Sequence, residues 1–395
     1  MNLRSRVDVL LGWTRWRAPH VVKSIRSPLW NRLRLAVHES CRRRIPVVSA
    51  SAEVDGRRMS FVYGGFEDGL RYIQPYIQDC LFGQDPVDVR KEMLTRRELL
   101  RKIDAEQPDL SIVAGGSRFV ESTPAERSIT MPFRIHQVVD TSQGWPAVQQ
   151  KMSRREVKRH GQWCEEYGYT SAPTRSADDY FWFYDRMVVP SMEVRYGKRD
   201  RSLGKEQGYH MIFRHGILFM VDSRTGRVAG STSELDSRRR LINARLIGVR
   251  DGDQDLRKYG AQNALYHFIL RWACENGYDR VDYQGCEPFL RKGTFQYKKR
   301  FATRAELPPN HYRFVRMRLR AGADSPQLRR FLAANPVMLI DAEGRLGAGY
   351  FHDDEHRPRL DVPYRCDGFE FEQLIDMTTF FGTSPRVRAP ELVPE

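Results

Sequence analysis

Residues 293–301, GTFQYKKRF, bring together side chains that could hold a negative charge. Lys298, Lys299 and Arg300 follow Tyr297 directly and lie between two phenylalanines. Three cations in a row are usually a solvated surface strip, whereas cations on a rigid element can bind an anionic ligand. If the segment is an edge strand, alternation places its aromatic residues on one face and Lys298 on the other. We therefore expect a strand with buried aromatic side chains and a Lys298 ammonium that a ligand can reach.

A second pattern that suits an anion is the turn Arg257-Lys258-Tyr259-Gly260-Ala261, where a polar loop enters a helix. A helix start exposes unpaired N–H groups and the positive end of the dipole, and small residues let a phosphate approach them. Arg257 would add a bidentate phosphate donor. Gln262 follows in a place where a small residue would leave more room.

The segments around this turn have a recognisable order. Alternating patterns predict strands at 209–222, 228–235 and 238–249. A loop and an amphipathic helix follow, with Gly277 placed to end the helix, and 279–285 leaves it as a short strand. The predicted order is meander, loop, helix, strand.

Further elements are predicted on both sides of this block. Ser153 and Glu156 form a capping-box signature for a helix that Gly168 ends. Residues 178–189 predict a largely buried helix ended by Pro190, and 335–351 a hairpin. The first turns of the Ser153 helix carry four cations, which oppose the helix dipole unless they are solvated or an anion lies across them. These are Arg154, Arg155, Lys158 and Arg159.

The segment 265–304 resembles the closing part of the FemAB-like branch (CelD/BcsL-type acetyltransferases) of the GNAT acyltransferase superfamily. In that branch a helix with W-A and a final G-Y leads to a D-x-x-G strand and then to an aromatic-Lys pair. The matching residues are Trp272-Ala273, Gly277-Tyr278, Asp282 to Gly285, and Tyr297-Lys298 to Phe301. Tyr297 replaces the usual phenylalanine, and Ala302 replaces the usual glycine. With the helices upstream, the resemblance covers roughly residues 130–310.

The resemblance implies an N-acyltransferase, in which a substrate amine attacks an activated acyl or aminoacyl group directly. It implies that Lys298 lies at the active cleft, where a fixed cation stabilises the oxyanion formed during the attack. Asp282 and Glu234 are the acids that could accept the proton of the amine, although each could equally be a salt-bridge partner. No metal is expected. The residues predicted to bind the donor are Arg257, Gly260, Ala261, Tyr297, Arg291 and Lys292.

Two acyl donors are compatible with these residues. Aminoacyl-tRNA suits the FemAB-like branch and the net charge of +15, and acyl-CoA or an acidic acyl carrier protein suits the superfamily as a whole. The acceptor is an amine whose identity stays open. The alternative to an enzyme is a catalytically degenerate transferase fold that binds RNA or a protein partner. The basic N-terminus and Gln262 favour that alternative.

The implied fold class is α/β (α+β), with two GNAT-like lobes of mixed, largely antiparallel sheets flanked by helices, and a C-terminal hairpin extension. We expect a basic segment and a degenerate first lobe at 1–150, the acyltransferase lobe at 151–320 and an acidic extension at 321–395. Residues 1–45 hold eleven Arg or Lys against two acids, and 350–395 hold ten acids against five bases. This polarity would orient a charged partner.

The remaining features concern location. The six cysteines are scattered without a C-x-x-C pair, which argues against a zinc site or a disulfide framework and favours a reducing cytoplasm. No apolar run approaches the ~20 residues of a membrane span, and a signal peptide is not expected. A helical face with Leu3, Val7, Leu10 and Leu11 would dock on its own domain or, less often, contact a membrane surface.

Overall fold

The computed structural model describes residues 28–41, 43–197, 204–382 and 391–392. The chain forms two compact units. Unit 1 comprises Met1–Ile135, Cys286–Gln296 and Ala305–Glu395, and unit 2 comprises His136–Gly285 and Tyr297–Arg304. The predicted apolar face at Leu3–Leu11 lies outside the described residues. None of the described helices is long and apolar enough to cross a membrane.

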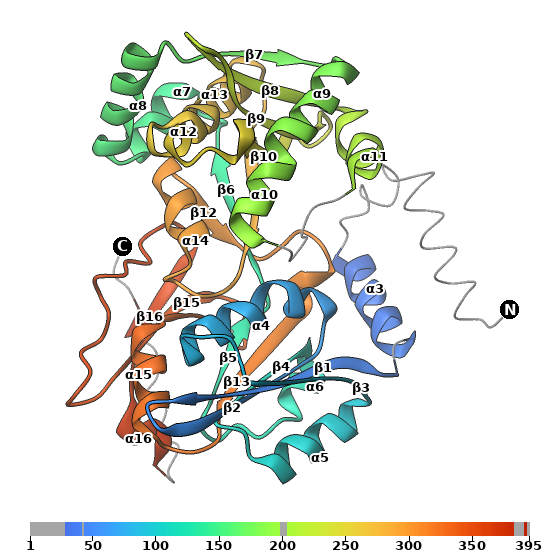
Figure 1. The fold of residues 1–395 in the computed structure, drawn as a ribbon, viewed down its shortest axis with the longest axis vertical. Coiled ribbons are helices and arrows are strands. Elements are labelled where there is room, and N and C mark those ends of the chain that lie inside the picture. Colours follow the sequence, from blue (N-terminus) through green and yellow to red (C-terminus); the bar gives the residue numbers. More distant parts are fainter. Residues whose placement is uncertain (1–27, 42, 198–203, 383–390, 393–395) are drawn as a thin grey trace, which may run out of the picture. The chain divides into compact units, whose positions relative to one another are not determined.

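Unit 1 contains a six-stranded sheet and a four-stranded sheet (Figure 1). The order of the larger sheet is β3-β1-β2-β4-β13-β5. Its strands are β1 (Ile45–Val54), β2 (Arg57–Gly64), β3 (Asp88–Leu94), β4 (Leu110–Gly116), β5 (Ser128–Pro132) and β13 (Val315–Ala321). The smaller sheet contains β14 (Val337–Ile340), β15 (Leu346–His352), β16 (Phe369–Asp376) and β17 (Glu391–Leu392). The helices are α3 (Pro28–Cys41), α4 (Glu67–Phe82), α5 (Arg96–Glu106), α6 (Ser117–Glu121), α15 (Pro326–Ala334) and α16 (Met377–Phe381).

Unit 2 is built on a seven-stranded sheet with the order β12-β6-β11-β10-β9-β8-β7, in which only Arg304 of β12 belongs to this unit. Its strands are β6 (Ile135–Asp140), β7 (Thr170–Thr174), β8 (Gly216–Ser223), β9 (Gly226–Asp236), β10 (Leu241–Val249), β11 (Arg280–Cys286) and β12 (Arg304–Glu306). The helices are α7 (Trp145–Lys151), α8 (Arg154–Tyr167), α9 (Ala177–Phe183), α10 (Val189–Tyr196), α11 (Lys205–Gly208), α12 (Gln254–Lys258) and α13 (Ala261–Glu275). Helix α14 (Gly293–Lys298) begins in unit 1 and ends in unit 2.

The two large sheets repeat one topology. In unit 1, β1 pairs antiparallel with β2, and β2 pairs parallel with β4. In unit 2, β9 pairs antiparallel with β10, and β10 pairs parallel with β11. In each sheet two further strands complete the far side of the parallel pair, β13 and β5 in one and β6 and β12 in the other. The predicted fold class, α/β with mixed and largely antiparallel sheets, is confirmed.

The predicted meander and the helix after it are present. Strands β8, β9 and β10 are antiparallel neighbours, and the buried side of α13 packs on them through Leu265 and Ile269. The hairpin at 335–351 is present as β14 and β15. The N-terminal part of the predicted 209–222 strand is instead a π-helical turn at Tyr209–Phe213, and the strand begins at Gly216.

Two other local predictions were wrong. The 293–301 segment is α14 followed by a 3-10 turn, Lys299–Phe301, rather than a strand. Its buried residues, Phe295, Lys298 and Phe301, recur every three positions, a spacing that fits a helix and not a strand. Pro190 does not end the 178–189 helix, because a π-helical turn at Tyr184–Val188 widens the helix and places the proline in the first turn of α10, where no N–H is needed.

The compact units also divide the chain differently from the predicted segments 1–150, 151–320 and 321–395. Strand β13 pairs with both β4 and β5, so residues 315–321 complete the sheet of unit 1. Residues after 321 supply α15 and β15, whose Leu328 and Phe351 lie in the same core cluster as Phe61 and Ile112. The C-terminal region therefore belongs to the core of unit 1.

Gly260, at the start of α13, offers a test of the packing in unit 2. It has a φ of +83°, and a Cβ atom there would lie 2.1 Å from the Trp163 indole of α8. Gly260→Ala should therefore lower the free energy of unfolding by about 3 kcal/mol, through backbone strain and overpacking. Gly161→Ala, within α8 and with nothing near its added methyl, should raise it by about 0.5–1 kcal/mol. Urea denaturation measures both, and equal changes would contradict the contact with Trp163.

Candidate functional site

A row of polar residues crosses the middle of the unit 2 sheet. Glu234 of β9 is the cross-strand partner of Asn243 in β10, and Asn243 is the partner of Asp282 in β11. Cross-strand partners point to the same face of a sheet, so the three side chains form one row. Asn243 and Asp282 are buried, and Glu234 is partly exposed at the end of the row.

The row lies where β10 and β11 stop pairing. Their parallel register covers Leu241–Asn243, after which β10 bulges between Ala244 and Ile247. On the other side, Gln284 of β11 has a left-handed φ of 66°. A non-glycine residue in that region is strained and persists only where its surroundings hold it. The end of β11 therefore departs from regular strand geometry two residues after Asp282.

His136 extends the polar row onto β6. Its Nδ1 is 2.8 Å from Asp282 Oδ2, and the Gln284 N–H donates to Asp282 Oδ1 at 2.7 Å. Burial alone would raise the pKa of Asp282. The nearby His136, the Gln284 N–H that donates to Asp282 and the Lys298 ammonium together hold this pKa below its usual value. An ionised Asp282 requires the proton on Nδ1, which leaves His136 Nε2 as the basic nitrogen. Sequence reasoning missed His136, because it lies 146 positions from its partner.

Lys298 is buried beside this pair, with 7% of its surface exposed. Its Nζ donates to the carbonyl oxygens of Gln284 (3.1 Å) and Gly285 (3.5 Å), which the turn at Gln284 directs toward it. The ammonium also contributes to the low pKa of Asp282. The expectation that Lys298 lies on a strand face opposite the aromatic residues was wrong, because Lys298 lies on a helix and is buried with Phe295 and Phe301. Its ammonium is held on protein carbonyls at the end of β11.

Tyr297 is tied to the first turn of α13. Its hydroxyl donates to Asn263 Oδ1 at 3.1 Å, and Asn263 Nδ2 donates to Glu156 Oε1 at 2.7 Å. Burial, with Tyr266 and Glu156 nearby, raises the pKa of Tyr297 far above its usual value, so the phenol stays protonated. The predicted capping box is only half formed: Ser153 Oγ accepts from the Glu156 N–H, but the Glu156 carboxylate turns to Asn263 instead.

Two stacked histidines lie beside Glu156. The His160 ring lies 3.8 Å from the ring of His267 and parallel to it, and His267 Nε2 is 3.5 Å from Glu156 Oε1. Burial and the nearby His267 lower the pKa of His160 from 6.5 to about 3, against the smaller opposing effect of Glu156. Within the described ranges, no group of three or more His, Cys, Asp or Glu side chains is arranged to hold a metal ion.

The low pKa of His160 predicts a pH dependence of stability. Between pH 6.5 and about 3 the unfolded chain binds a proton at this position and the folded chain does not, so stability falls as the pH falls through this window. His160→Phe keeps an aromatic ring and removes the proton site. Its free energy of unfolding, from urea titrations at several pH values, should fall less steeply with acid than that of the wild type. An unaltered slope in His160→Phe would contradict the prediction.

Other side chains cover the turn Arg257–Ala261, which the sequence predicts to bind a phosphate. Gly260 and Ala261 are buried, and the Trp163 indole occupies the place where a Cβ of Gly260 would lie. Gln262 Oε1 accepts a hydrogen bond from Arg195 Nη2 at 2.8 Å. Arg257 is half-buried at the end of α12, and its Nη1 is 3.4 Å from Gln254 Oε1. This geometry leaves little room for a pyrophosphate at the turn.

The other predicted donor-binding residues, Arg291 and Lys292, belong to unit 1. Arg291 is exposed. Lys292 Nζ lies 4.3 Å from the centre of the Tyr76 ring and 3.9 Å from Glu287 Oε2. Of the predicted site residues, unit 2 thus brings Lys298 next to Asp282, places Glu234 in the same row, and joins Tyr297 to the first turn of α13.

No protein-family model and no curated protein matches the chain. Solved structures that resemble it include FemX, with 8% identity over 68% of this chain and 82% of that one at a TM-score of 0.38. L-PGS from Bacillus licheniformis has 12% identity over 77% and 95%, at a TM-score of 0.34. A GCN5-related N-acetyltransferase from Sphaerobacter thermophilus has 15% identity over 71% and 78%, at 0.33.

Proposed function

We propose that the chain is an N-acyltransferase whose chemistry takes place at the end of β11 in unit 2. The observation that supports this most directly is the buried Lys298 ammonium beside the Asp282–His136 pair. An amine that attacks an activated carboxyl group generates an oxyanion, which a fixed cation in a water-poor site stabilises strongly. Removing the proton of the amine requires a base, and an imidazole held by a carboxylate is well suited to this.

In the proposed reaction, His136 Nε2 accepts a proton from the attacking amine as the new N–C bond forms. Lys298 stabilises the negative charge that develops on the acyl oxygen. The bond from the acyl carbon to the leaving oxygen or sulfur then breaks, and His136 returns the proton to the leaving group. Asp282 is a positioning residue, because its low pKa keeps it ionised and this holds His136 in the Nδ1–H tautomer.

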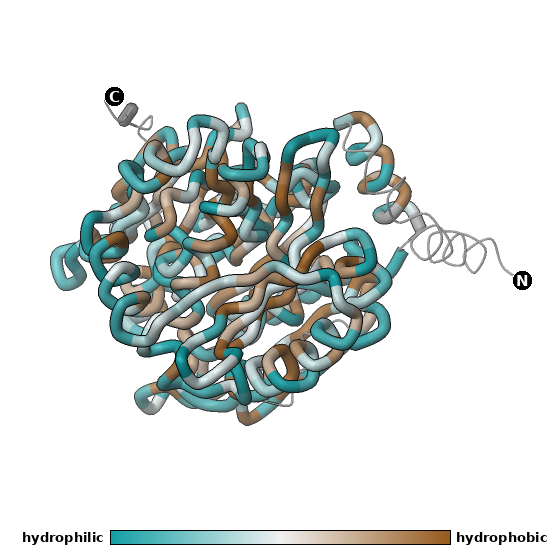
Figure 2. Tube along the Cα trace, turned by 90° about the horizontal axis from the view of Figure 1, so that it is seen from above, coloured by the Kyte–Doolittle hydropathy of each residue, from teal (hydrophilic) through white to brown (hydrophobic). Residues whose placement is uncertain are grey.

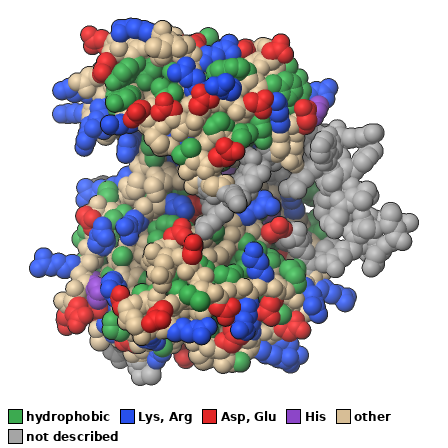
Figure 3. Space-filling view, in the orientation of Figure 1, with side chains coloured by type: hydrophobic (Ala, Val, Ile, Leu, Met, Phe, Trp, Pro, Cys, Tyr) green, Lys and Arg blue, Asp and Glu red, His purple; other side chains and the backbone are tan. Residues whose placement is uncertain are grey.

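Aminoacyl-tRNA is the proposed acyl donor. The packed turn at Gly260 disfavours a pyrophosphate there, and helix α8 carries a cluster of exposed cations. Figure 3 shows Lys and Arg side chains gathered over α8. These side chains, spaced along the first turns of the helix, suit the closely spaced phosphates of an RNA backbone. They belong to Arg154, Arg155, Lys158 and Arg159, all of which are exposed.

A donor assay tests the proposal. The protein is incubated with a mixed aminoacyl-tRNA pool and a panel of amines, or with acyl-CoA and the same panel, and products are identified by mass. Transfer from aminoacyl-tRNA that RNase abolishes is the expected result. Transfer from acyl-CoA alone would contradict the proposed donor but not the reaction. Salt-sensitive RNA binding without any transfer would favour the alternative of a binding module.

The role of α8 can be tested separately by replacing its four cations with glutamine. Each cation that contacts a phosphate adds to the tRNA affinity and to its dependence on salt. The variant should therefore bind tRNA at least about tenfold more weakly, and its affinity should fall less steeply as the salt concentration rises. A matched control removes four exposed cations of unit 1, namely Arg90, Lys91, Arg97 and Arg101. An equal loss in the control would assign the binding to net charge rather than to α8.

A further inference from the structure

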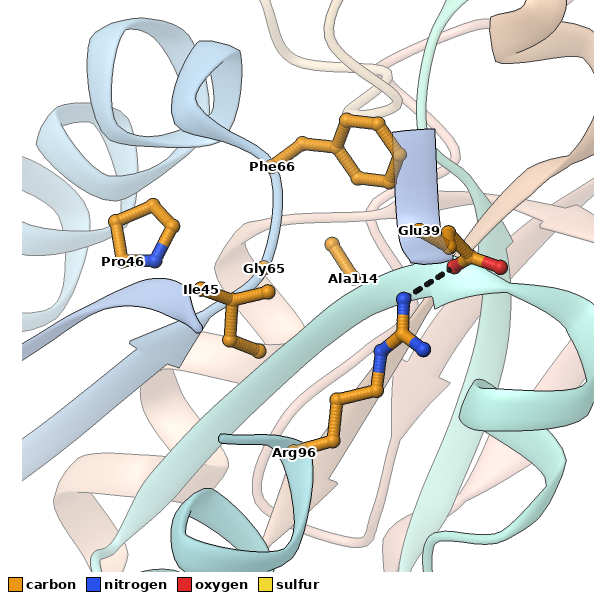
Figure 4. A pocket seen from close by; sticks show the side chains of 7 residues that line it. All are labelled: Glu39, Ile45, Pro46, Gly65, Phe66, Arg96 and Ala114. Atoms are coloured by element: carbon orange, nitrogen blue, oxygen red, sulfur yellow. Dashed lines mark ion pairs between the residues drawn. The ribbon is translucent and has the colours of Figure 1, made fainter. Parts of the chain in front are cut away.

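A pocket in unit 1 lies at the carboxyl end of the parallel pair β2 and β4 (Figure 4). The parallel register of these strands ends at Gly64 and Val113, and the pocket begins with the next residue of each strand, Gly65 and Ala114. Ile45, Pro46 and Phe66 supply apolar lining. Glu39 of α3 and Arg96 of α5 supply the charged side. The pocket is therefore apolar on one side and ionic on the other.

The ionic side has the chemistry of a carboxylate receptor. Glu39 Oε1 accepts from the Gly116 N–H at 2.8 Å and lies 3.0 Å from Arg96 Nη2. A backbone N–H and a guanidinium together form a charge-assisted site for one carboxylate. Arg96 Nε is buried and has no hydrogen-bond partner among the described residues, so the receptor has a donor that Glu39 does not use.

Two glycines let a carboxylate approach the backbone at this place. A Cβ on Gly116 would lie 2.9 Å from Glu39 Oε2. A Cβ on Gly65, whose φ is +151°, would lie 2.3 Å from the Ala114 carbonyl oxygen. Any larger residue would therefore close the junction between the strand ends. Such close access is a requirement for binding a ligand against the backbone.

The helix that carries Glu39 has few other buried contacts. Asn31 and Leu35 are its buried side chains among those described, and Asn31 Nδ2 donates to the Pro309 carbonyl oxygen at 3.1 Å. Leu29, Leu33 and Val37, one turn apart, are exposed. Figure 2 shows hydrophobic segments along α3. Release of Glu39 would thus disrupt little packing.

We propose that this pocket binds a small monocarboxylate with an apolar side chain, such as an N-acyl amino acid or a peptide C-terminus, and that Glu39 occupies the carboxylate position when the ligand is absent. The ligand carboxylate would take the Gly116 N–H and Arg96, and its apolar part would lie against Ile45 and Phe66. Binding would displace the Glu39 carboxylate and loosen α3. This site is in unit 1 and does not depend on the transfer chemistry proposed for unit 2.

The test uses the full chain and N-acetyl-leucine, with N-acetyl-leucinamide as the uncharged control. Calorimetry should detect the acid and not the amide. In the wild type the Glu39 carboxylate is a tethered competitor, present at an effective millimolar concentration. Glu39→Gln weakens this competitor, so the variant should bind the acid at least about tenfold more tightly. Adding Arg96→Gln to that variant should abolish binding. Adding Arg97→Gln, an equal charge change at an exposed neighbour, should not.

Hydrogen exchange of the wild type provides a readout that needs no variant. Saturation with N-acetyl-leucine should increase the amide exchange of residues 28–41, while the amide control leaves it unchanged. The inference is overturned if α3 exchange does not change at saturating acid, if acid and amide bind equally, or if the Arg96→Gln change has no effect on binding.

Discussion

Replacing His136 with glutamine should lower kcat by about 10²–10⁴-fold, the contribution typical of a positioned general base. Glutamine can still hydrogen-bond to Asp282, but it cannot accept a proton from the attacking amine. The variant should retain the KM of the wild type within a small factor, because His136 is not proposed to bind the donor. Steady-state rates with the proposed aminoacyl-tRNA donor give both constants.

The split between kcat and KM separates a base from a residue with a structural role. His136→Gln should lose kcat at a nearly unchanged KM and should unfold at a temperature close to that of the wild type. Asp282→Asn, which allows the wrong imidazole tautomer, should also lose most of the rate. His160→Gln, a change at another histidine of unit 2, should keep most of the rate. A rate loss in Glu234→Gln with full activity in His136→Gln would place the base at the other end of the row.

Replacing Lys298 with methionine should lower kcat by about 10²–10³-fold, as expected when one donor to a developing oxyanion is removed. Methionine keeps much of the length of the side chain and removes the charge. Lys299→Met makes the same change in the next residue and should have little effect on the rate. Circular dichroism and thermal unfolding of both variants show whether the carbonyls of Gln284 and Gly285 tolerate the loss of their donor.

The Lys298 result also distinguishes the two functions that the sequence supports. Full turnover in Lys298→Met would remove the cation from the proposed mechanism. Unchanged RNA binding by a protein that never transfers an acyl group would favour the degenerate, RNA-binding alternative. A lower kcat with unchanged RNA affinity is the outcome expected of an acyltransferase.

Elements with a clear local pattern could be predicted from the sequence. The three-stranded meander, α13 and the β14–β15 hairpin follow from alternation, from a helical apolar face and from turn glycines. The 293–301 segment could not be predicted in the same way, because both of its phenylalanines sit at odd positions and satisfy a strand pattern by chance. Its burial every third residue becomes visible only when the packing is known.

Contacts between distant positions account for the rest. Asp282 could be singled out by its place in the D-x-x-G motif, but its partner His136 comes from another strand far earlier in the chain. The Trp163 indole, which fills the space beside Gly260, belongs to a helix that precedes Gly260 by about a hundred residues. The repeated topology of the two sheets is a matter of strand order, which a single sequence with divergent halves does not display.

The position of β13 has a consequence for biosynthesis. This strand lies between β4 and β5, yet it is encoded almost two hundred residues after β4. During translation, which proceeds from the N-terminus, β4 and β5 must wait for all of unit 2 to leave the ribosome. Unit 2 has its last residues by Arg304 and can therefore fold first. A nascent chain stalled just after residue 304 has left the ribosome should thus carry a folded unit 2 and an unfinished unit 1 with unsatisfied strand edges, which is the stage at which a chaperone would be needed most.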